Sequence, residues 1–172
     1  MELFGRKKGS GESVWEIKKQ IGFFNTAMTD LFNKSYSLEE MILSGFFDSI
    51  GLYTEPTTLQ RRIAEQWLEA IQMSHLKNKI FKRLTIGQQR VALIARAVIK
   101  HPPLLILDEP LEGLDDQNII LVTQLINLIK KETNIAILFV SHRIEPNLSP
   151  DSVLELTPSP TGSKGIIKTI TN

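Results

Sequence analysis

The chain has 172 residues, of which 42% are hydrophobic and 23% are charged, an ordinary composition for one globular domain. Its 20 Lys and Arg residues oppose 19 Asp and Glu residues, so the formal net charge of +1 gives no bulk attraction for nucleic acid. The absence of cysteine excludes disulfides and thiolate metal sites, and no apolar run is long enough to cross a bilayer. We therefore expect a cytoplasmic domain without a nucleic-acid partner.

The first 24 residues predict two strands separated by a turn and a helix. A short strand around Glu2 to Phe4 leads into the basic turn 5-GRKKGSG-11. Ser13 and Glu16 then form a capping-box pattern, which favours the start of a short helix. The apolar run 21-IGFF-24 is typical of a buried strand.

Residues 26–83 predict a helical segment. Ser37 with Glu40 and Thr57 with Gln60 repeat the capping-box pattern ahead of apolar-periodic stretches. We expect most large apolar side chains of this part of the chain to be buried, although the aromatic cluster of residues 46–53 could instead contact a partner. The side chains expected in the core include Trp15, Phe46, Phe47, Ile50, Tyr53 and Trp67.

The second half alternates predicted helices with apolar strands. Helices are expected over 84–100 and 115–131, and strands over 104–107 and 135–140. Continuous apolar strands separated by helices favour a parallel sheet covered on both faces. The segment 151–172 is most simply a β-hairpin.

Polar residues follow both of these apolar strands. Asp108 and Glu109 come after the first, and Ser141 and His142 come after the second. Because the carboxyl ends of parallel strands meet at one edge of a sheet, we expect these side chains to lie close together. An acid that holds Mg²⁺, an acid that activates water and a histidine that contacts phosphate would serve phosphoryl transfer. Taken singly, each is as well explained as a solvated turn or a structural histidine.

The segment 84-LTIGQQR-90 precedes the predicted helix over 84–100. Thr85 can cap that helix, and Gly87 lets a ligand approach the backbone without meeting a Cβ. The exposed amides and the helix dipole would make an anion site.

Followed by ALIARAVIKHPPLLILDEPLEGLD and later by FVSH, this segment resembles the ATP-binding cassette (ABC) family of ATPases. Within that family, GSGESVWEIKKQIGF and ILSGFFDSIGLY are similar to the C-terminal nucleotide-binding half of the molybdenum-transport and photorepair group. The resemblance implies an α/β fold: a partial P-loop NTPase core with a parallel sheet, an α-helical subdomain and a C-terminal β-hairpin. It divides the chain into core residues 1–25, helical subdomain 26–83, a second core part 84–150 and hairpin 151–172.

The resemblance also assigns roles for ATP and Mg²⁺. By this resemblance, Asp108 would be the Mg²⁺ ligand, Glu109 the general base and His142 the contact to the γ-phosphate. The signature loop would act on a nucleotide held by a second ABC domain, with Asp115 in the D-loop at the seam between the two. The residues of that loop are Thr85, Ile86, Gly87 and Gln88, with Ile86 in place of a family glycine. A membrane permease is a further implied partner, which would place the domain at the periphery of the inner membrane.

The sequence departs from the family in one major respect. The phosphate loop G-x-x-x-x-G-K-[ST] is absent from these 172 residues, and the turn 5–11 lacks a lysine after its second glycine. The family's loop glutamine falls near Thr26. We therefore expect a truncated ABC domain, or one whose phosphate loop lies on another polypeptide, and an inactive isolated chain. The alternative is a non-hydrolysing or regulatory partner that lends only its signature loop to a complete ABC subunit.

Overall fold

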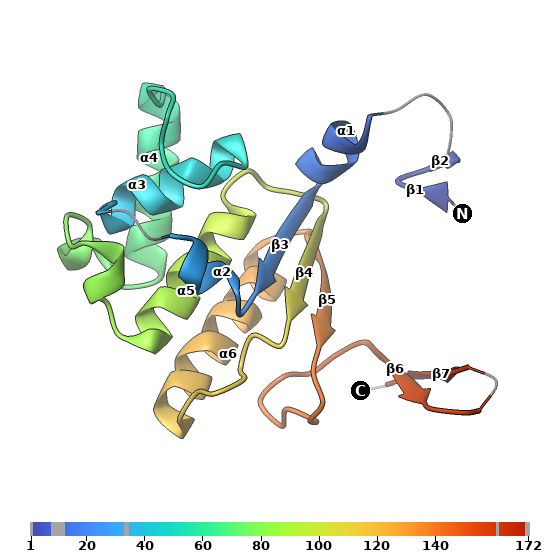
Figure 1. Ribbon diagram of the computed structural model, residues 1–172. Coiled ribbons are helices and arrows are strands. Elements are labelled where there is room, and N and C mark those ends of the chain that lie inside the picture. The colour runs from blue at the N-terminus through green and yellow to red at the C-terminus, as the bar shows by residue number, and fades with distance from the viewer. Residues whose placement is uncertain (1, 8–12, 33–34, 161, 171–172) are drawn as a thin grey trace.

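The computed structural model describes residues 2–7, 13–32, 35–160 and 162–170 of the 172-residue chain. A small central sheet has helices on one side, a further group of helices beyond them on that same side, and a separate hairpin near the C-terminus (Figure 1). None of the described helices is long and apolar enough to span a bilayer.

The central sheet has three parallel strands in the order β3-β4-β5. Their bounds are Ile21–Asn25 for β3, Leu104–Asp108 for β4 and Ala136–Val140 for β5. The register aligns Asn25, Asp108 and Val140, so the three strands end at the same level. The predicted parallel sheet is therefore confirmed, and its carboxyl edge gathers the loops that carry the candidate site.

One face of the sheet is buried by two helices, α5 (Ile86–Val98) and α6 (Asp116–Glu132). Phe24, Leu105 and Leu107 on this face are fully buried. Gly22 allows the close approach of β3 to α5, because a Cβ at this position would lie 2.4 Å from the carbonyl oxygen of Ala97. These contacts make the main hydrophobic core.

The opposite face of the sheet is not covered by a helix of the described residues (Figure 1). Phe23, Leu138 and Val140 alternate with the buried residues and are 43%, 50% and 41% exposed. The prediction of a sheet covered on both faces is therefore wrong for this part of the chain. Continuous apolar strands favour burial on both faces, but no described segment packs against this side.

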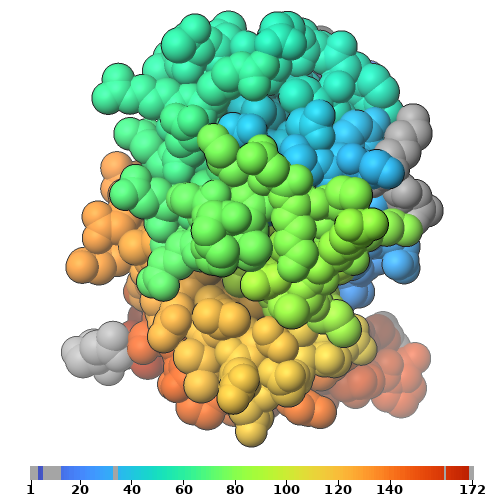
Figure 2. Space-filling view, turned by 90° about the vertical axis from the view of Figure 1, so that its left-hand side faces the viewer, coloured from blue at the N-terminus to red at the C-terminus, as the bar shows by residue number. Residues whose placement is uncertain are grey.

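The segment between β3 and α5 is helical, as the capping patterns predict. In Figure 2 it forms the upper part of the face shown, with α6 below it. The bounds are α2 Met28–Leu31, α3 Leu38–Leu43, η1 Ser44–Phe47, α4 Thr58–Ala70, η2 Ser74–Leu76 and η3 Phe81–Arg83. Complete capping boxes begin α3 and α4, through Ser37 with Glu40 and Thr57 with Gln60. Both predicted helix starts are confirmed.

The two ends of the chain carry small antiparallel pairs. Strands β1 (Glu2–Leu3) and β2 (Arg6–Lys7) pair with each other, and part of the predicted turn 5–11 lies outside the described residues. Near the C-terminus, β6 (Ser152–Thr157) and β7 (Lys164–Thr169) form the predicted hairpin. The α/β class with a parallel sheet, a helical group and a C-terminal hairpin is thus confirmed.

Some apolar side chains that we expected in the core are exposed. Trp15 is 70% exposed on α1 (Val14–Lys19), a six-residue helix with no buried residue. Ile50 and Tyr53 are also exposed, whereas Phe46 and Trp67 pack against the core as predicted. A short helix offers one apolar side chain nothing to pack against unless another element lies beside it.

Arg96 of α5 joins the helical group to the core. Its Nε donates to Ser44 Oγ at 3.0 Å, its Nη2 donates to the Ser49 carbonyl oxygen at 2.9 Å, and its guanidinium lies over the Phe32 ring. Burial lowers the pKa of Arg96 to about 10, although Asp48 opposes that effect. The side chain remains charged at neutral pH, so its hydrogen bonds are charge-assisted.

Arg96→Met is expected to lower the free energy of unfolding by about 3 kcal/mol, because it removes two hydrogen bonds from a charged donor and leaves buried acceptors without it. Urea unfolding would measure the loss. Arg83→Met, at an exposed position, is the matched control and should change stability little. Equal losses in the two variants would contradict this structural role of Arg96.

Candidate functional site

The acidic pair lies at the carboxyl end of the central strand. Asp108 is the last residue of β4, and Glu109 follows it with a left-handed backbone, φ 48°. The Glu109 amide donates to the Val140 carbonyl oxygen at 3.0 Å, which ties the turn to the end of β5. A non-glycine residue held at positive φ by a neighbouring strand has a side-chain direction set by the fold.

His142 lies beside this acid. Its Nε2 is 3.4 Å from Glu109 Oε1, and the His142 side chain is 96% exposed while that of Glu109 is 22% exposed. The predicted juxtaposition at the sheet edge is therefore present in the structure. A half-buried carboxylate such as that of Glu109 can accept a proton from water. It can also orient the neighbouring imidazole, whose N–H can donate to an incoming phosphate. The catalytic roles of Glu109 and His142 stay predictions.

The described residues contain no group of three or more His, Asp or Glu side chains that could hold a metal ion by themselves. Magnesium in nucleotide sites takes one or two carboxylates together with water and substrate phosphates, so a single acid at a strand end fits it. Asp108 is partly buried at such a position. That Asp108 would hold Mg²⁺ beside bound ATP, where the ion would supply charge neutralisation, stays a prediction.

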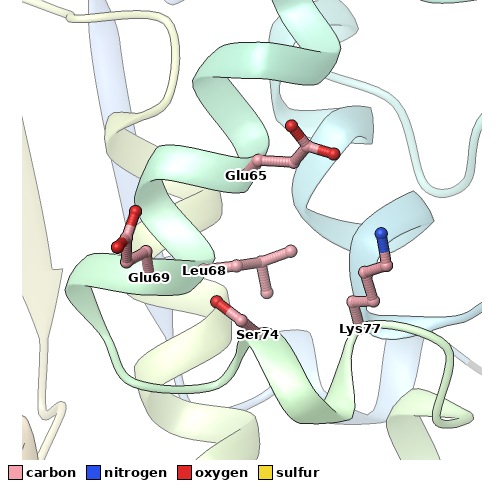
Figure 3. A pocket seen from close by; sticks show the side chains of 5 residues that line it. All are labelled: Glu65, Leu68, Glu69, Ser74 and Lys77. Atoms are coloured by element: carbon pink, nitrogen blue, oxygen red, sulfur yellow. The ribbon is translucent and has the colours of Figure 1, made fainter.

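Two hollows of the surface lie away from this edge. The first, about 260 Å³, is lined by Glu65, Leu68 and Glu69 of α4 with Ser74 and Lys77, and Figure 3 shows Leu68 between Glu69 and Lys77. The second, about 240 Å³, lies between α4 and α6 and is lined mainly by apolar side chains. Neither contains a residue that the sequence assigned to nucleotide binding.

The signature segment forms the first turn of α5. Thr85 is its N-cap, with Oγ1 accepting from the Gln88 amide at 3.2 Å. Gln88 Oε1 accepts from the Thr85 amide at 3.1 Å, so the two side chains complete a capping box. Ile86 is 60% exposed and points out beside the first free amides of the helix. The segment therefore presents a helix N-terminus at the surface, as an anion site requires.

Gly87 packs against α6. A Cβ built on Gly87 would lie 1.7 Å from Asn118 Oδ1 and 2.4 Å from Asn118 Cγ. The missing side chain therefore makes room for Asn118, whereas the sequence pattern favours room for a ligand. The part of Gly87 in nucleotide binding stays a prediction.

Asp115 is the N-cap of α6. Its Oδ1 accepts hydrogen bonds from both the backbone amide and the side-chain Nδ2 of Asn118, each at 2.9 Å. The carboxylate of the predicted D-loop residue is thus engaged in holding its own helix. Thr26, at the position of the family's loop glutamine, follows the end of β3 next to β4 and so lies near the same edge.

Sequence reasoning missed two residues that connect these parts, Asn118 and Arg90. Arg90 is 7% exposed, and its Nη2 donates to the Glu112 carbonyl oxygen at 3.1 Å. Its Nε and Nη1 are buried without a hydrogen-bond partner in the part of the chain that the structure describes. Burial lowers the pKa of Arg90, against the opposing charge of Glu112. The sequence did offer one signal for Arg90: it is a charged residue on the apolar side of a predicted helix, three positions after Gly87.

Comparisons with known proteins show the family of this chain. A family model described as ABC transporter matches residues 3–112, more than half of the chain. ModF of Escherichia coli, an ABC transporter ATP-binding protein, is 43% identical over 146 residues, covering 84% of this chain and 30% of ModF. MolC of Haemophilus influenzae, a molybdate import ATP-binding protein, is 30% identical over 132 residues, covering 77% of this chain and 51% of MolC.

A solved structure shows the same fold. The ADP conformation of MJ1267, an ATP-binding cassette of an ABC transporter, superposes with a TM-score of 0.68 at 18% identity, covering 88% of this chain and 63% of that one. The chain thus spans less than two thirds of each of these proteins. From the family match and the shared fold together, we conclude that this chain belongs to the ABC transporter family and is built like an ATP-binding cassette domain.

Proposed function

We propose that the chain is an ATP-hydrolysing component of an ABC transport system. The observation that carries this proposal is the pairing of Glu109 with His142 at 3.4 Å on the strand edge that also holds Asp108. Asp108 would hold the nucleotide's Mg²⁺, Glu109 would take the proton of the attacking water, and His142 would orient toward the γ-phosphate. Catalysis of this kind depends on positioning and charge neutralisation, which fixed strand ends provide.

The phosphate loop would come from a segment outside these 172 residues, because the string is absent from them. The exposed edge of β5 and the uncovered face carrying Phe23 and Leu138 support this, since both are apolar and unpaired among the described residues. A strand and helix that carried the loop would bury them.

The second subunit would be another ABC domain, whose nucleotide would face the first turn of α5. We propose molybdate as the transported substrate, since MolC is named for molybdate import. Photorepair appears in neither of the relatives' names given above. A membrane permease would complete the system.

A second function, in which the chain only lends its signature loop, rests on a different observation. The α5 N-terminus is complete within these residues, with its Thr85 and Gln88 capping box and the exposed Ile86, whereas the phosphate loop is not. Such a chain would activate a partner without hydrolysing ATP itself.

The role of the signature loop is tested by mixing this chain with ModF whose own signature loop has been disabled. The wild-type chain is expected to raise the ATPase rate of the mixture, and Ile86→Asp to abolish the gain by placing a carboxylate against the incoming phosphate. Ile86→Asn introduces a side chain of the same shape as aspartate but without its charge, and it should retain most of the gain in ATPase rate. No stimulation by the wild-type chain, or equal effects of Asp and Asn, would refute the trans role.

A further inference from the structure

We propose that Asn118 is a positioning residue that fixes the signature helix to the loop following the hydrolytic acid, so that the two move as one unit. The inference rests on the proposed function, in which α5 faces a nucleotide held by another subunit while Glu109 faces the nucleotide of its own. It gives Asn118 a task that neither its type nor its exposure suggests.

The two ends of the Asn118 carboxamide have different neighbours, a hydrogen-bond acceptor at Nδ2 and the Gly87 backbone beside Oδ1. Its Nδ2 donates to Asp115 Oδ1 at 2.9 Å, and the backbone amide of Asn118 donates to the same oxygen. This fixes the orientation of the side chain, so that Oδ1 is the atom directed at Gly87, where a Cβ would lie only 1.7 Å away. The first turn of α5 therefore lies directly against the first turn of α6.

Arg90 makes a second attachment on the same side of α5. It lies three residues after Gly87, so both face the loop between β4 and α6. Its Nη2 donates to the Glu112 carbonyl oxygen at 3.1 Å, and the Glu112 amide donates to the Glu109 carbonyl oxygen at 3.2 Å. A continuous path of hydrogen bonds thus runs from the candidate base to the signature helix, and Asn118 closes the other end of that loop.

It matters that the Asn118 side chain is uncharged, as well as what shape it has. Its Oδ1 lies beside the N-terminal turn of α5, where the amides and the dipole favour an anion. A carboxylate at this position would supply an internal anion, repel Asp115 and compete with the partner's phosphate. An amide holds the helix without occupying its electrostatic site.

A double-mutant cycle tests the attachment without reference to activity. Gly87→Ala is expected to lower the urea midpoint of the full chain, because its Cβ overlaps Asn118 Oδ1. Asn118→Ala removes that oxygen and leaves only the Asn118 Cβ, at 3.0 Å, so Gly87→Ala should then cost much less. Equal costs of Gly87→Ala in the two backgrounds would overturn the contact.

The mixture with signature-disabled ModF tests the positioning role. Asn118→Asp is expected to raise the apparent KM for ATP in the stimulated reaction about threefold to tenfold, an effect that falls with added salt. Asn118→Ala, which is neutral but no longer holds the helix, is expected to lower the stimulated kcat with little change in KM. Gln117→Asp adds the same charge at an exposed neighbouring position of α6 and is the matched control.

The outcomes separate the two proposals. Stimulation by the wild-type chain with equal KM values for Asn118→Asp and Gln117→Asp overturns the positioning role and leaves the proposed function standing. Absence of any wild-type stimulation refutes the proposed trans function, and the cycle between positions 87 and 118 then still decides whether the two helices are fixed to each other. Coupling in the cycle together with a KM effect specific to position 118 supports the inference.

Discussion

Glu109→Gln, made in a protein with the phosphate-loop strand, loop and helix of a complete ABC domain joined ahead of Met1, is expected to lower ATP turnover about 100-fold or more. The amide cannot take a proton from water, whereas Asp108 still holds Mg²⁺, so nucleotide binding should be retained. The close contact of Glu109 with His142 supports an acid poised for this role. Steady-state ATPase assays and equilibrium binding of Mg²⁺-ATP would measure the two quantities separately.

The control for this prediction is Glu132→Gln, the same change at an exposed position near the end of α6. It should leave turnover unchanged. Turnover that Glu109→Gln does not reduce would remove Glu109 from the catalytic role and favour a chain that only lends its signature loop. The same measurement therefore discriminates between the two proposed functions.

The 172-residue chain by itself is expected to hydrolyse ATP no faster than a buffer control, and the joined phosphate-loop segment is expected to restore a clear, Mg²⁺-dependent rate. Most binding energy for the β- and γ-phosphates comes from loop amides, a lysine and Mg²⁺, and the first two are missing from the sequence. Asp108 and Glu109 alone would repel the nucleotide.

Asp108→Ala separates this expectation from contamination. It should leave the baseline of the 172-residue chain unchanged and abolish the rate of the joined protein, because only the latter assembles a Mg²⁺ site around the nucleotide. Robust hydrolysis by the pure 172-residue chain that depends on Mg²⁺ and on Asp108 would show that these residues contain a phosphate cradle of another form.

The sequence by itself determined the local structure and the order of the motifs. The capping boxes at Ser13, Ser37 and Thr57 were predicted correctly, because each depends on two side chains and backbone amides only three residues apart. The placement of Glu109 and His142 at one edge also followed, since parallel strands bring their carboxyl ends together whatever lies between them.

Only the tertiary structure decided which apolar residues are covered and which side chains lie next to a small residue such as Gly87. Trp15 and Phe23 are large apolar residues of the kind usually buried, but both are exposed. Burial requires a second helix or strand packed beside them, and the local sequence does not encode that neighbour. Gly87 is restricted by Asn118, 31 positions along the chain, and Arg90 by the Glu112 carbonyl. Such contacts arise from the packing of α5 on α6. The sequence pattern of one helix does not say which side chains of another helix will pack against it.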